Sequence, residues 1–356
     1  MSLYLCVDCG GSKTSAVIAD SNANVVGRGL GGPSNFAYLS LDAFIAAVSD
    51  AVTEALKPCL PSSAEVISLP LRTAPFTVAW FGVSGADSPA AISAITQALS
   101  PLLNIPIGSR LQVTNDTHLL AAPLLMHSDT SHAVAVIAGT GANAVSFRKS
   151  GDELEELGRY GGWGWILGDE GGGFSIGREM IRQLLHENDK ASVRGVPPPE
   201  SKLRTSILQF FGVAHVMELL TAIHFVNPIG ATVTSDPPSY ALMAREKRLS
   251  SLSPLVFAAA FEDSDPLALV VLRTMAEELA SRIALLLAPD NDESQRAVKA
   301  RETLLSFGGS LAGVDEYRQM ILGQLECRGH VFKRVEYVNE AAVVGAVGLA
   351  IAFGRA

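Results

Sequence analysis

A pattern of strand, glycine-rich turn and strand occurs twice in the chain and constrains its fold more than any other feature. Residues 3–20 read LYLCVDCGGSKTSAVIAD, in which two apolar, β-rich runs flank Gly10 and Gly11. Residues 132–149 read HAVAVIAGTGANAVSFRK, with the same form but little identity. We interpret the second stretch as an echo of form and not as a sequence repeat.

The other elements predicted in the first half alternate between strand and helix. In residues 41–56 the apolar side chains fall at helical spacing on one face: Leu41, Phe44, Ile45, Val48, Val52 and Leu56. Pro89 suits the first turn of a helix that runs to Leu103. Further strands are predicted at 25–30, 76–85 and 111–116, and a helix begins at 117. The order β-β-β-α-β-α-β-α predicts an α/β fold.

The second half contains a long helical region. We expect mostly helix between residues 171 and 287, and the clearest helix, 265–287, carries an apolar seam: Leu267, Val271, Met275, Leu279 and Ile283. Two proline-bearing segments, 194–202 and 226–240, are predicted surface loops. Residues 303–313 predict strand, glycine turn and helix, and residues 338–353 predict a closing helix. A chain of 356 residues that is 48% apolar is long enough for two domains.

Composition narrows the possible partners and the location of the protein. The net charge is −9, and no run of Lys and Arg offers phosphate neutralisation, so we expect no nucleic-acid partner. The longest apolar run, 341–353, is too short to span a bilayer, so no membrane partner is expected. No targeting signal is visible, and four cysteines do not form a disulfide framework. These features favour a cytoplasmic protein.

Three glycine turns, 8–14, 138–143 and 307–313, each follow an apolar strand. Glycine allows positive φ and lets a ligand approach backbone N–H groups closely. The first two turns also carry groups that bind phosphate well: Ser12, Lys13, Thr14 and Thr140. Any one of these turns could be an ordinary hairpin connection. Their joint occurrence in this order favours phosphate binding.

With these turns the sequence resembles the actin-like ATPase superfamily of sugar kinases, and within it the N-acetylglucosamine kinase family. The resemblance covers residues 4–350. It implies two actin-like (ribonuclease H-like) lobes, each a mixed sheet flanked by helices, with a nucleotide and sugar cleft between them. The N-terminal lobe would comprise 1–117 and be completed by the C-terminal helix 340–356. The C-terminal lobe would comprise 118–339.

The resemblance also implies a nucleotide site that binds ATP and Mg²⁺. In the first phosphate turn the matching residues are Gly10, Gly11, Ser12, Lys13 and Thr14. The second phosphate turn matches at Gly139, Thr140 and Gly141, and the turn on the adenosine side matches at Gly308, Gly309 and Ser310. Asp8 would hold Mg²⁺, mainly through water.

The segment GGWGWILGDEGGGFSIG, residues 161–177, is the most specific part of the resemblance. Asp169 can accept hydrogen bonds from sugar hydroxyls, and Trp163 offers an apolar face. The alternative is a glycine-rich loop in which Trp163 and Trp165 anchor the core. The resemblance implies a sugar site at these residues: Asn35, Asp116, Gly162, Trp163, Gly164 and Asp169.

Asp116 lies where a predicted strand ends and a helix begins. Open α/β sheets bind ligands at the carboxyl ends of strands, so this carboxylate is a candidate catalytic residue. It could equally cap the following helix, and the residues alone leave both possibilities open. The resemblance implies that Asp116 is the general base.

The pair Cys6 and Cys9 could instead form a metal or redox CxxC motif. No second cysteine pair or Cys/His cluster completes a zinc site, and Cys59 and Cys327 stand alone. If the strand runs to Cys9, the two thiols also point to opposite faces. We therefore favour the phosphate turn.

The resemblance implies ATP-dependent phosphorylation of the 6-hydroxyl of N-acetyl-D-glucosamine. Small-molecule sugar and ATP would be its partners, and it implies a possible homodimer. The alternatives are a kinase of another amino sugar or hexose, such as glucosamine or glucose, and a nucleotide-dependent sensor that binds sugar without turning it over.

Overall fold

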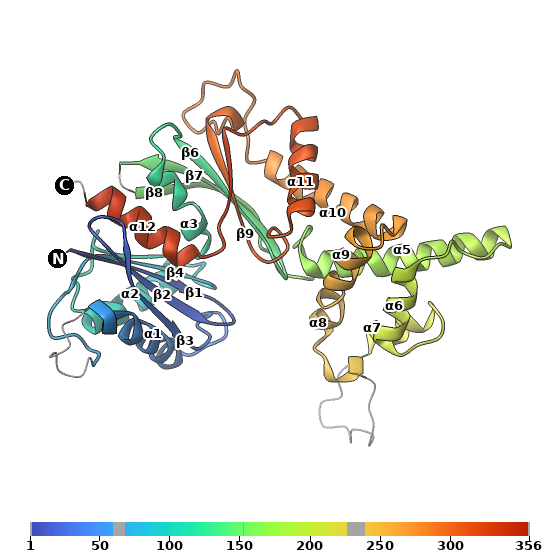
Figure 1. Ribbon diagram of the computed structural model, residues 1–356, viewed down its shortest axis with the longest axis horizontal. Coiled ribbons are helices and arrows are strands. Elements are labelled where there is room, and N and C mark those ends of the chain that lie inside the picture. The colour runs from blue at the N-terminus through green and yellow to red at the C-terminus, as the bar shows by residue number, and fades with distance from the viewer. Residues whose placement is uncertain (1, 60–67, 152, 226–238, 355–356) are drawn as a thin grey trace.

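The computed structural model describes residues 2–59, 68–151, 153–225 and 239–354. Two five-stranded mixed sheets, each flanked by helices, form two lobes, and a helical arm extends from the second (Figure 1). The expected fold class is therefore confirmed. Most of the predicted loop 226–240 lies outside the described residues.

The first lobe is built on a sheet of order β3-β2-β1-β4-β5. Its strands are β1 (Leu3–Cys9), β2 (Thr14–Asp20), β3 (Val25–Gly31), β4 (Phe76–Val83) and β5 (Leu111–Thr114). β1 is antiparallel to β2 and parallel to β4, and β4 is parallel to β5. The carboxyl ends of β1, β4 and β5 therefore meet at one edge of the sheet, where ligands bind in folds of this type.

Helices cover both faces of this sheet. α1 (Leu41–Leu56) and α2 (Pro89–Leu103) pack on one face of the sheet. The short helix η1 (Lys57–Cys59) directly follows α1 in the chain. On the predicted face of α1, Phe44, Val48, Val52 and Leu56 are buried, while Leu41 is exposed. α12 (Ala341–Phe353), the predicted closing helix, packs on the other face of β1 and β2.

α1 lies unusually close to β3 because every second residue of that strand is glycine. A Cβ added at Gly27, Gly29 or Gly31 would lie 2.1, 2.0 or 2.1 Å from a carbonyl oxygen of α1. No side chain fits there, so these glycines set the distance between helix and sheet.

The second lobe repeats this plan, as the echo in the sequence predicts. The strands are β6 (His132–Ala138), β7 (Ala142–Ser150), β8 (Glu153–Gly161), β9 (Thr303–Gly308) and β10 (Arg334–Tyr337), in the order β10-β9-β6-β7-β8. β6 pairs with β7 and β9 as β1 pairs with β2 and β4. The strands β8 and β10 were not predicted from the sequence.

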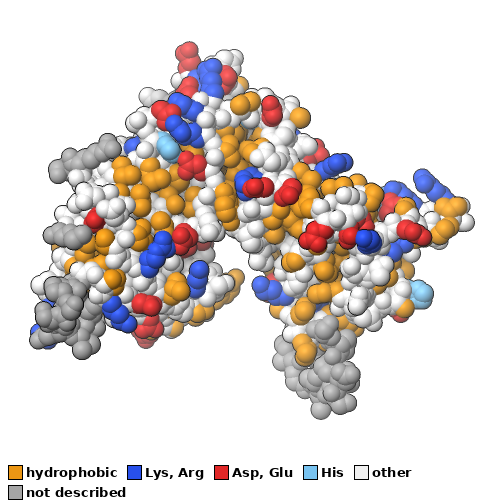
Figure 2. Space-filling model, in the orientation of Figure 1, with side chains coloured by type: hydrophobic (Ala, Val, Ile, Leu, Met, Phe, Trp, Pro, Cys, Tyr) orange, Lys and Arg blue, Asp and Glu red, His pale blue; other side chains and the backbone are white. Residues whose placement is uncertain are grey.

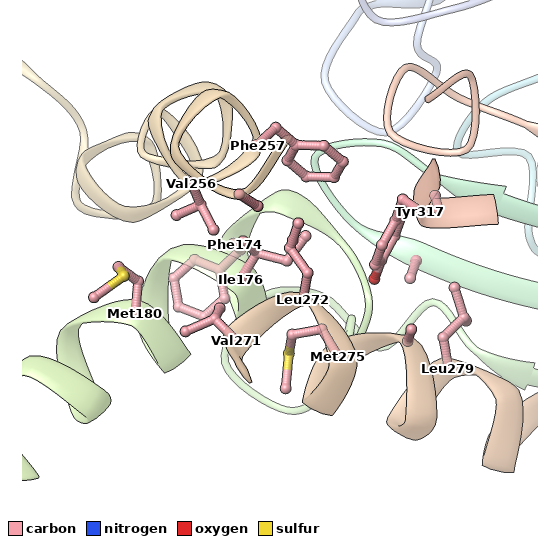
Figure 3. Packing of buried hydrophobic residues seen from close by; sticks show 14 of the residues in the cluster. Phe174, Ile176, Met180, Val256, Phe257, Val271, Leu272, Met275, Leu279 and Tyr317 are labelled. Carbon is pink, nitrogen blue, oxygen red and sulfur yellow. The ribbon is translucent and has the colours of Figure 1, made fainter. Parts of the chain in front are cut away.

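The helical arm and its neighbours form one large core. The helices are α5 (Gly173–Arg194), α6 (Lys202–Phe211), α7 (Glu218–His224), η2 (Ser239–Leu242), α8 (Arg245–Ser250), α9 (Ser253–Phe261), α10 (Pro266–Ala284), η3 (Ala300–Glu302) and α11 (Asp315–Cys327). Side chains of α5, α9 and α10 interdigitate there, as Figure 3 shows for Phe174, Phe257 and Met275. The predicted seam of α10 is buried except at Leu267.

Short helices join the two lobes. α3 (Thr117–Leu120) and α4 (Pro123–Met126) follow β5, and both contact α12. Leu120 and Leu124 are buried with residues of the second sheet, including Ala135 and Phe147. α3 and α12 therefore lie between the sheets (Figure 1). Among the described residues, no helix is long and apolar enough to cross a membrane.

The contact between α1 and β3 yields a prediction about stability. Gly29→Ala places a methyl group against the backbone of α1 and should lower the free energy of unfolding by about 1–3 kcal/mol, the usual cost of overpacking. Thermal and urea denaturation measure this effect. Gly32→Ala is the matched control, because a Cβ added at Gly32 meets nothing within 4 Å. Equal stabilities of the two variants would contradict the close approach.

Candidate active site

Asp116 lies between β5 and α3, at the edge where the parallel strands end. The Ser84 hydroxyl donates a 2.7 Å hydrogen bond to its Oδ2. Asp116 occupies the cap position of α3, but its side chain makes no capping hydrogen bond. The cap is Asn115, whose Oδ1 accepts the N–H and hydroxyl of Thr117 at 3.1 and 2.8 Å. The carboxylate of Asp116 is therefore not used as a helix cap.

Ser84 joins three predicted parts of the site. Its N–H donates to the carbonyl of Cys9, just before the first glycine turn, at 2.9 Å. Its carbonyl accepts the N–H of Phe36, next to Asn35, at 2.9 Å. Its hydroxyl binds Asp116. The first glycine turn, the Asn35 loop and Asp116 therefore meet at one serine.

The first glycine turn is open to a ligand. Gly11, Ser12 and Lys13 are exposed, and a Cβ added at Gly11 would meet nothing within 4 Å. Thr14 differs from the other predicted phosphate ligands because it is fully buried. Its hydroxyl lies 2.7 Å from both the Gly32 carbonyl oxygen and the Ser34 hydroxyl. In this structure Thr14 therefore holds the turn against the following loop.

Asp8 is the last residue of β1 to point toward the junction of the lobes, on the same strand face as Cys6. Burial, and then the negative charge of Asp116, raise its pKa to about 6, while Lys13 opposes the rise. Burial also raises the pKa of Asp116. Two carboxylates that disfavour each other's ionisation fit a cation between or beside them, so the residues present fit Mg²⁺.

Asn35 lies in the loop before α1 and is half-buried. Its Oδ1 accepts the N–H of Ala37 at 2.9 Å. Gly85 has φ of +80°, and a Cβ there would lie 2.6 Å from that oxygen. The amide Nδ2 has no hydrogen-bond partner among the described residues and remains free to bind a ligand.

In the second lobe, the two remaining glycine turns lie against each other. Gly309 has φ of +90°, and a Cβ there would lie 2.5 Å from the carbonyl oxygen of Ala138. The N–H groups of Leu311 and Ala312 donate to that same oxygen at 2.9 and 3.1 Å. Gly308 is buried, whereas Thr140, Gly309 and Ser310 are exposed.

The segment predicted to bind the sugar, residues 161–172 and called the sugar loop below, reaches the predicted second phosphate turn through Asp169. This residue has φ of +65°, and a Cβ added at Gly141 would lie 2.6 Å from its Oδ2. The backbone N–H groups of Ala142 and Gly164 hydrogen-bond its carboxylate and lower its pKa, but burial dominates and raises it. The sugar loop and the phosphate turn are thus one connected unit.

Trp163 is not a core anchor, because 53% of it is exposed. It packs at 5.2 Å, centroid to centroid, against Tyr160. Gly162 and Gly164 on either side have φ of +70° and +81°, which explains the glycines. Trp165 does anchor the loop, since its ring lies 5.1 Å from that of Phe174.

Asp116 of the first lobe and Gly308 of the second lobe lie at opposite ends of the single-turn helix α3. Asp116 immediately precedes α3, and Leu120 at its end packs on Gly308, where a Cβ would lie 2.7 Å from the leucine side chain. Four helical residues span about 6 Å. Figure 2 shows an open notch between the first lobe and the helical arm. The candidate site lies at this junction of the lobes.

Several polar residues at this junction have no individual role in the sequence prediction. Ser84 and Asp87 belong to the segment VSGAD, residues 83–87, for which the resemblance implies only a supporting role beside the cleft. Asp87 accepts a 2.9 Å hydrogen bond from Arg159. Asn143 backs Gly162 and leaves a buried Oδ1 without a partner among the described residues. These residues carry no motif, because their roles depend on partners distant in sequence.

The thiols of Cys6 and Cys9 are buried in the core of the first lobe. Cys6 packs toward α12 and Cys9 toward α1, so the two thiols lie on opposite faces of β1, as expected. In the described part of the chain, no group of three or more His, Cys, Asp and Glu side chains is placed to hold a metal.

A cavity of about 480 Å³ lies behind α3, lined by residues such as Trp80, Thr114 and Leu154.

Known proteins match the chain over most of its length. It is 24% identical to N-acetyl-D-glucosamine kinase of Dictyostelium discoideum over 261 residues, 72% of this chain and 71% of that one. It is also 24% identical to N-acetylmuramic acid/N-acetylglucosamine kinase of Clostridium acetobutylicum over 325 residues, 90% of each chain.

Solved structures share the fold. A candidate N-acetylglucosamine kinase from Porphyromonas gingivalis superposes with a TM-score of 0.62 at 22% identity, over 100% of this chain and 99% of that one. A similar candidate from Chromobacterium violaceum gives 0.59 at 19% identity, over 98% and 99%. These relatives confirm the expected likeness to N-acetylglucosamine kinases. Residues 5–350 match the model of one family, and the chain belongs to it: the BadF/BadG/BcrA/BcrD ATPase family.

Proposed function

We propose that this protein is a sugar kinase that transfers the γ-phosphoryl group of ATP to the 6-hydroxyl of N-acetyl-D-glucosamine. One observation carries the proposal: Ser84 hydrogen-bonds the carboxylate of Asp116 at the point where the first glycine turn and the Asn35 loop meet. The names of the relatives in Dictyostelium discoideum and Clostridium acetobutylicum support this acceptor.

Phosphoryl transfer requires alignment and charge neutralisation more than covalent chemistry from the protein. The exposed N–H groups of Gly11 and Ser12 would face the β- and γ-phosphates from the first lobe, and those around Thr140 from the second. Gly309 and Ser310 would face the α-phosphate and ribose. Asp8 would hold Mg²⁺ through water, and the bound ion would neutralise charge on the phosphates.

Asp116 would act as the general base. Its Oδ1 is not used in the bond to Ser84, which donates to Oδ2, and would take the proton of the 6-hydroxyl as the oxygen attacks the γ-phosphorus. Burial raises the pKa of this carboxyl, which strengthens it as a proton acceptor.

The acceptor would lie between Asn35 in the first lobe and the sugar loop in the second. The free Nδ2 of Asn35 can donate to a sugar hydroxyl. Asp169 can accept hydroxyl protons, while exposed Trp163 and the backbone of Gly162 and Gly164 border the ring. Closure of the notch in Figure 2 would exclude water from the reaction.

The division at residues 117 and 118, a cytoplasmic location and a homodimer remain predictions. A kinase of another amino sugar or hexose, such as glucosamine or glucose, and a nucleotide-dependent sensor that leaves the sugar unphosphorylated remain alternatives to the proposed kinase, and an acceptor panel distinguishes these three.

An acceptor panel tests the function directly. The purified protein, ATP and Mg²⁺ are incubated with N-acetylglucosamine, N-acetylmuramic acid, glucosamine and glucose, and ADP and sugar phosphate are both measured. We expect the highest kcat/KM with N-acetylglucosamine and a phosphate on O6, as located by NMR. Preference for glucose would contradict the proposed acceptor. ADP without sugar phosphate would revive the sensor.

Asp116→Asn tests the base. The amide oxygen still accepts the bond from Ser84, but the residue cannot take a proton. We expect kcat to fall by about 10²–10⁴-fold, the usual contribution of a general base, with sugar and ATP affinities near those of the wild type. Calorimetry measures both affinities. Turnover at the wild-type rate would remove this assignment.

Asp169→Ala tests the sugar contact. A hydrogen bond to a charged group contributes roughly 1.5 kcal/mol or more, so sugar affinity should fall at least about tenfold while ATP affinity changes little. Asp189→Ala, on the exposed side of α5, is the control. An unchanged sugar affinity in the Asp169 variant would count against its role.

A further inference from the structure

Asp87 connects the two lobes beside the candidate base. One carboxylate oxygen, Oδ1, accepts a 2.9 Å hydrogen bond from Asn115 Nδ2 and another of 2.9 Å from Arg159 Nη1. Asn115 belongs to the first lobe and Arg159 to β8 of the second. A single oxygen therefore receives donors from both lobes.

Each end of this chain of bonds leads to a functional element. Asn115 precedes Asp116 and caps α3 through Thr117, so its orientation fixes the turn that carries the base. Arg159 lies two residues before Gly161, where β8 ends and the sugar loop begins. The bonds run from the strand that carries the sugar loop to the turn that carries Asp116.

We propose that Asp87 and Arg159 are positioning residues that hold the Asp116 turn in register with the sugar loop. The inference rests on the proposed function, because it assigns Asp116 the role of base. It explains why Asp87, with a side chain 56% exposed, is bonded on the same oxygen by two side chains.

Among the acidic groups near Arg159, Asp87 makes the shortest contact. Glu156 on the same strand lies 3.8 Å from Arg159 Nε and 3.9 Å from His118 Nε2, both longer than the 2.9 Å contact with Asp87. Burial dominates the raised pKa of Asp116, and among the charged groups Asp87 raises that pKa and Arg159 lowers it. Asp116 and Lys13 are the charged groups that act on the pKa of Asp8.

Because the ion pair of Asp87 and Arg159 is exposed, a positioning role can be distinguished from a role in stability. Ion pairs this exposed contribute little to stability, so breaking this pair should leave the melting temperature nearly unchanged. A misplaced base, in contrast, lowers turnover strongly, since errors of about 1 Å cost up to roughly a hundredfold. A kcat effect without a stability effect is the expected signature.

The test uses Asp87→Ala, Arg159→Met and the double variant, with Arg159→Lys as the conservative change. Glu155→Ala is the matched control, because it removes the Arg148–Glu155 pair, of similar exposure and within the second lobe. Steady-state kinetics, melting temperatures and hydrogen exchange of the amides of residues 117–120 are measured for each.

We expect the single variants to lower kcat by roughly tenfold or more with KM for ATP unchanged. The double variant should be no worse than Arg159→Met, Arg159→Lys should retain more activity, and Glu155→Ala should match the wild type. Amide exchange in α3 should accelerate in the Asp87 and Arg159 variants. Wild-type kcat in both single variants, or additive losses in the double variant, would overturn the inference.

The failure of this inference is distinguishable from failure of the proposed function. A wild type that phosphorylates no sugar refutes the function, and hydrogen exchange then still decides whether the link holds the turn. Unchanged exchange in α3 of both variants would overturn the link, whatever the enzyme catalyses.

Discussion

The contact between Leu120 and Gly308 holds the two halves of the candidate site together. Because Gly308 has no side chain, the end of α3 can lie directly on the end of β9. α3 begins immediately after Asp116, so this contact brings the carboxylate within about one helical turn of the second lobe's glycine turns. A side chain at residue 308 would push the lobes apart at that point.

Glycines serve two different purposes at this site. In the second lobe, packing alone requires Gly141, Gly172 and Gly309: a Cβ would collide with Asp169, with the backbone of Gly141 or with that of Ala138. In the first turn, a Cβ at Gly10 or Gly11 would meet no protein atom closer than 3.4 Å. Packing does not explain these two glycines, whereas the proposed phosphate group close to the backbone would.

The sequence predicted most elements of the fold because their signals are local. Apolar strands, helical spacing in 41–56 and 265–287 and the proline at 89 each determine structure over a few residues. β8 and β10 gave no such signal, because their residues are mostly polar and partly exposed. The hydroxyl of Thr14 is not free to bind a ligand, because it is bonded to Gly32 and Ser34. Only the tertiary structure brings these two residues near Thr14.

The predicted site residues differ from the missed ones in how far along the chain their partners lie. Asp116, Asp169 and the glycine turns carry motifs, and the structure brings them to one junction. Ser84 and Asp87 meet their partners across 32 and 72 residues of sequence, so their segment was given only a supporting role and no local pattern predicts these contacts. Motifs identify the groups proposed for the chemistry, whereas the residues that hold them emerge only from the fold.

A crystal structure with N-acetylglucosamine, Mg²⁺ and a non-hydrolysable ATP analogue tests the central claim most directly. The account predicts that Asp116 Oδ1 lies within hydrogen-bond distance of the sugar's 6-hydroxyl. It also predicts that this hydroxyl faces the γ-phosphate, which lies between the turns at residues 10–12 and 139–141. A sugar bound elsewhere, or an Asp116 bonded only to Ser84 in that complex, would contradict the account.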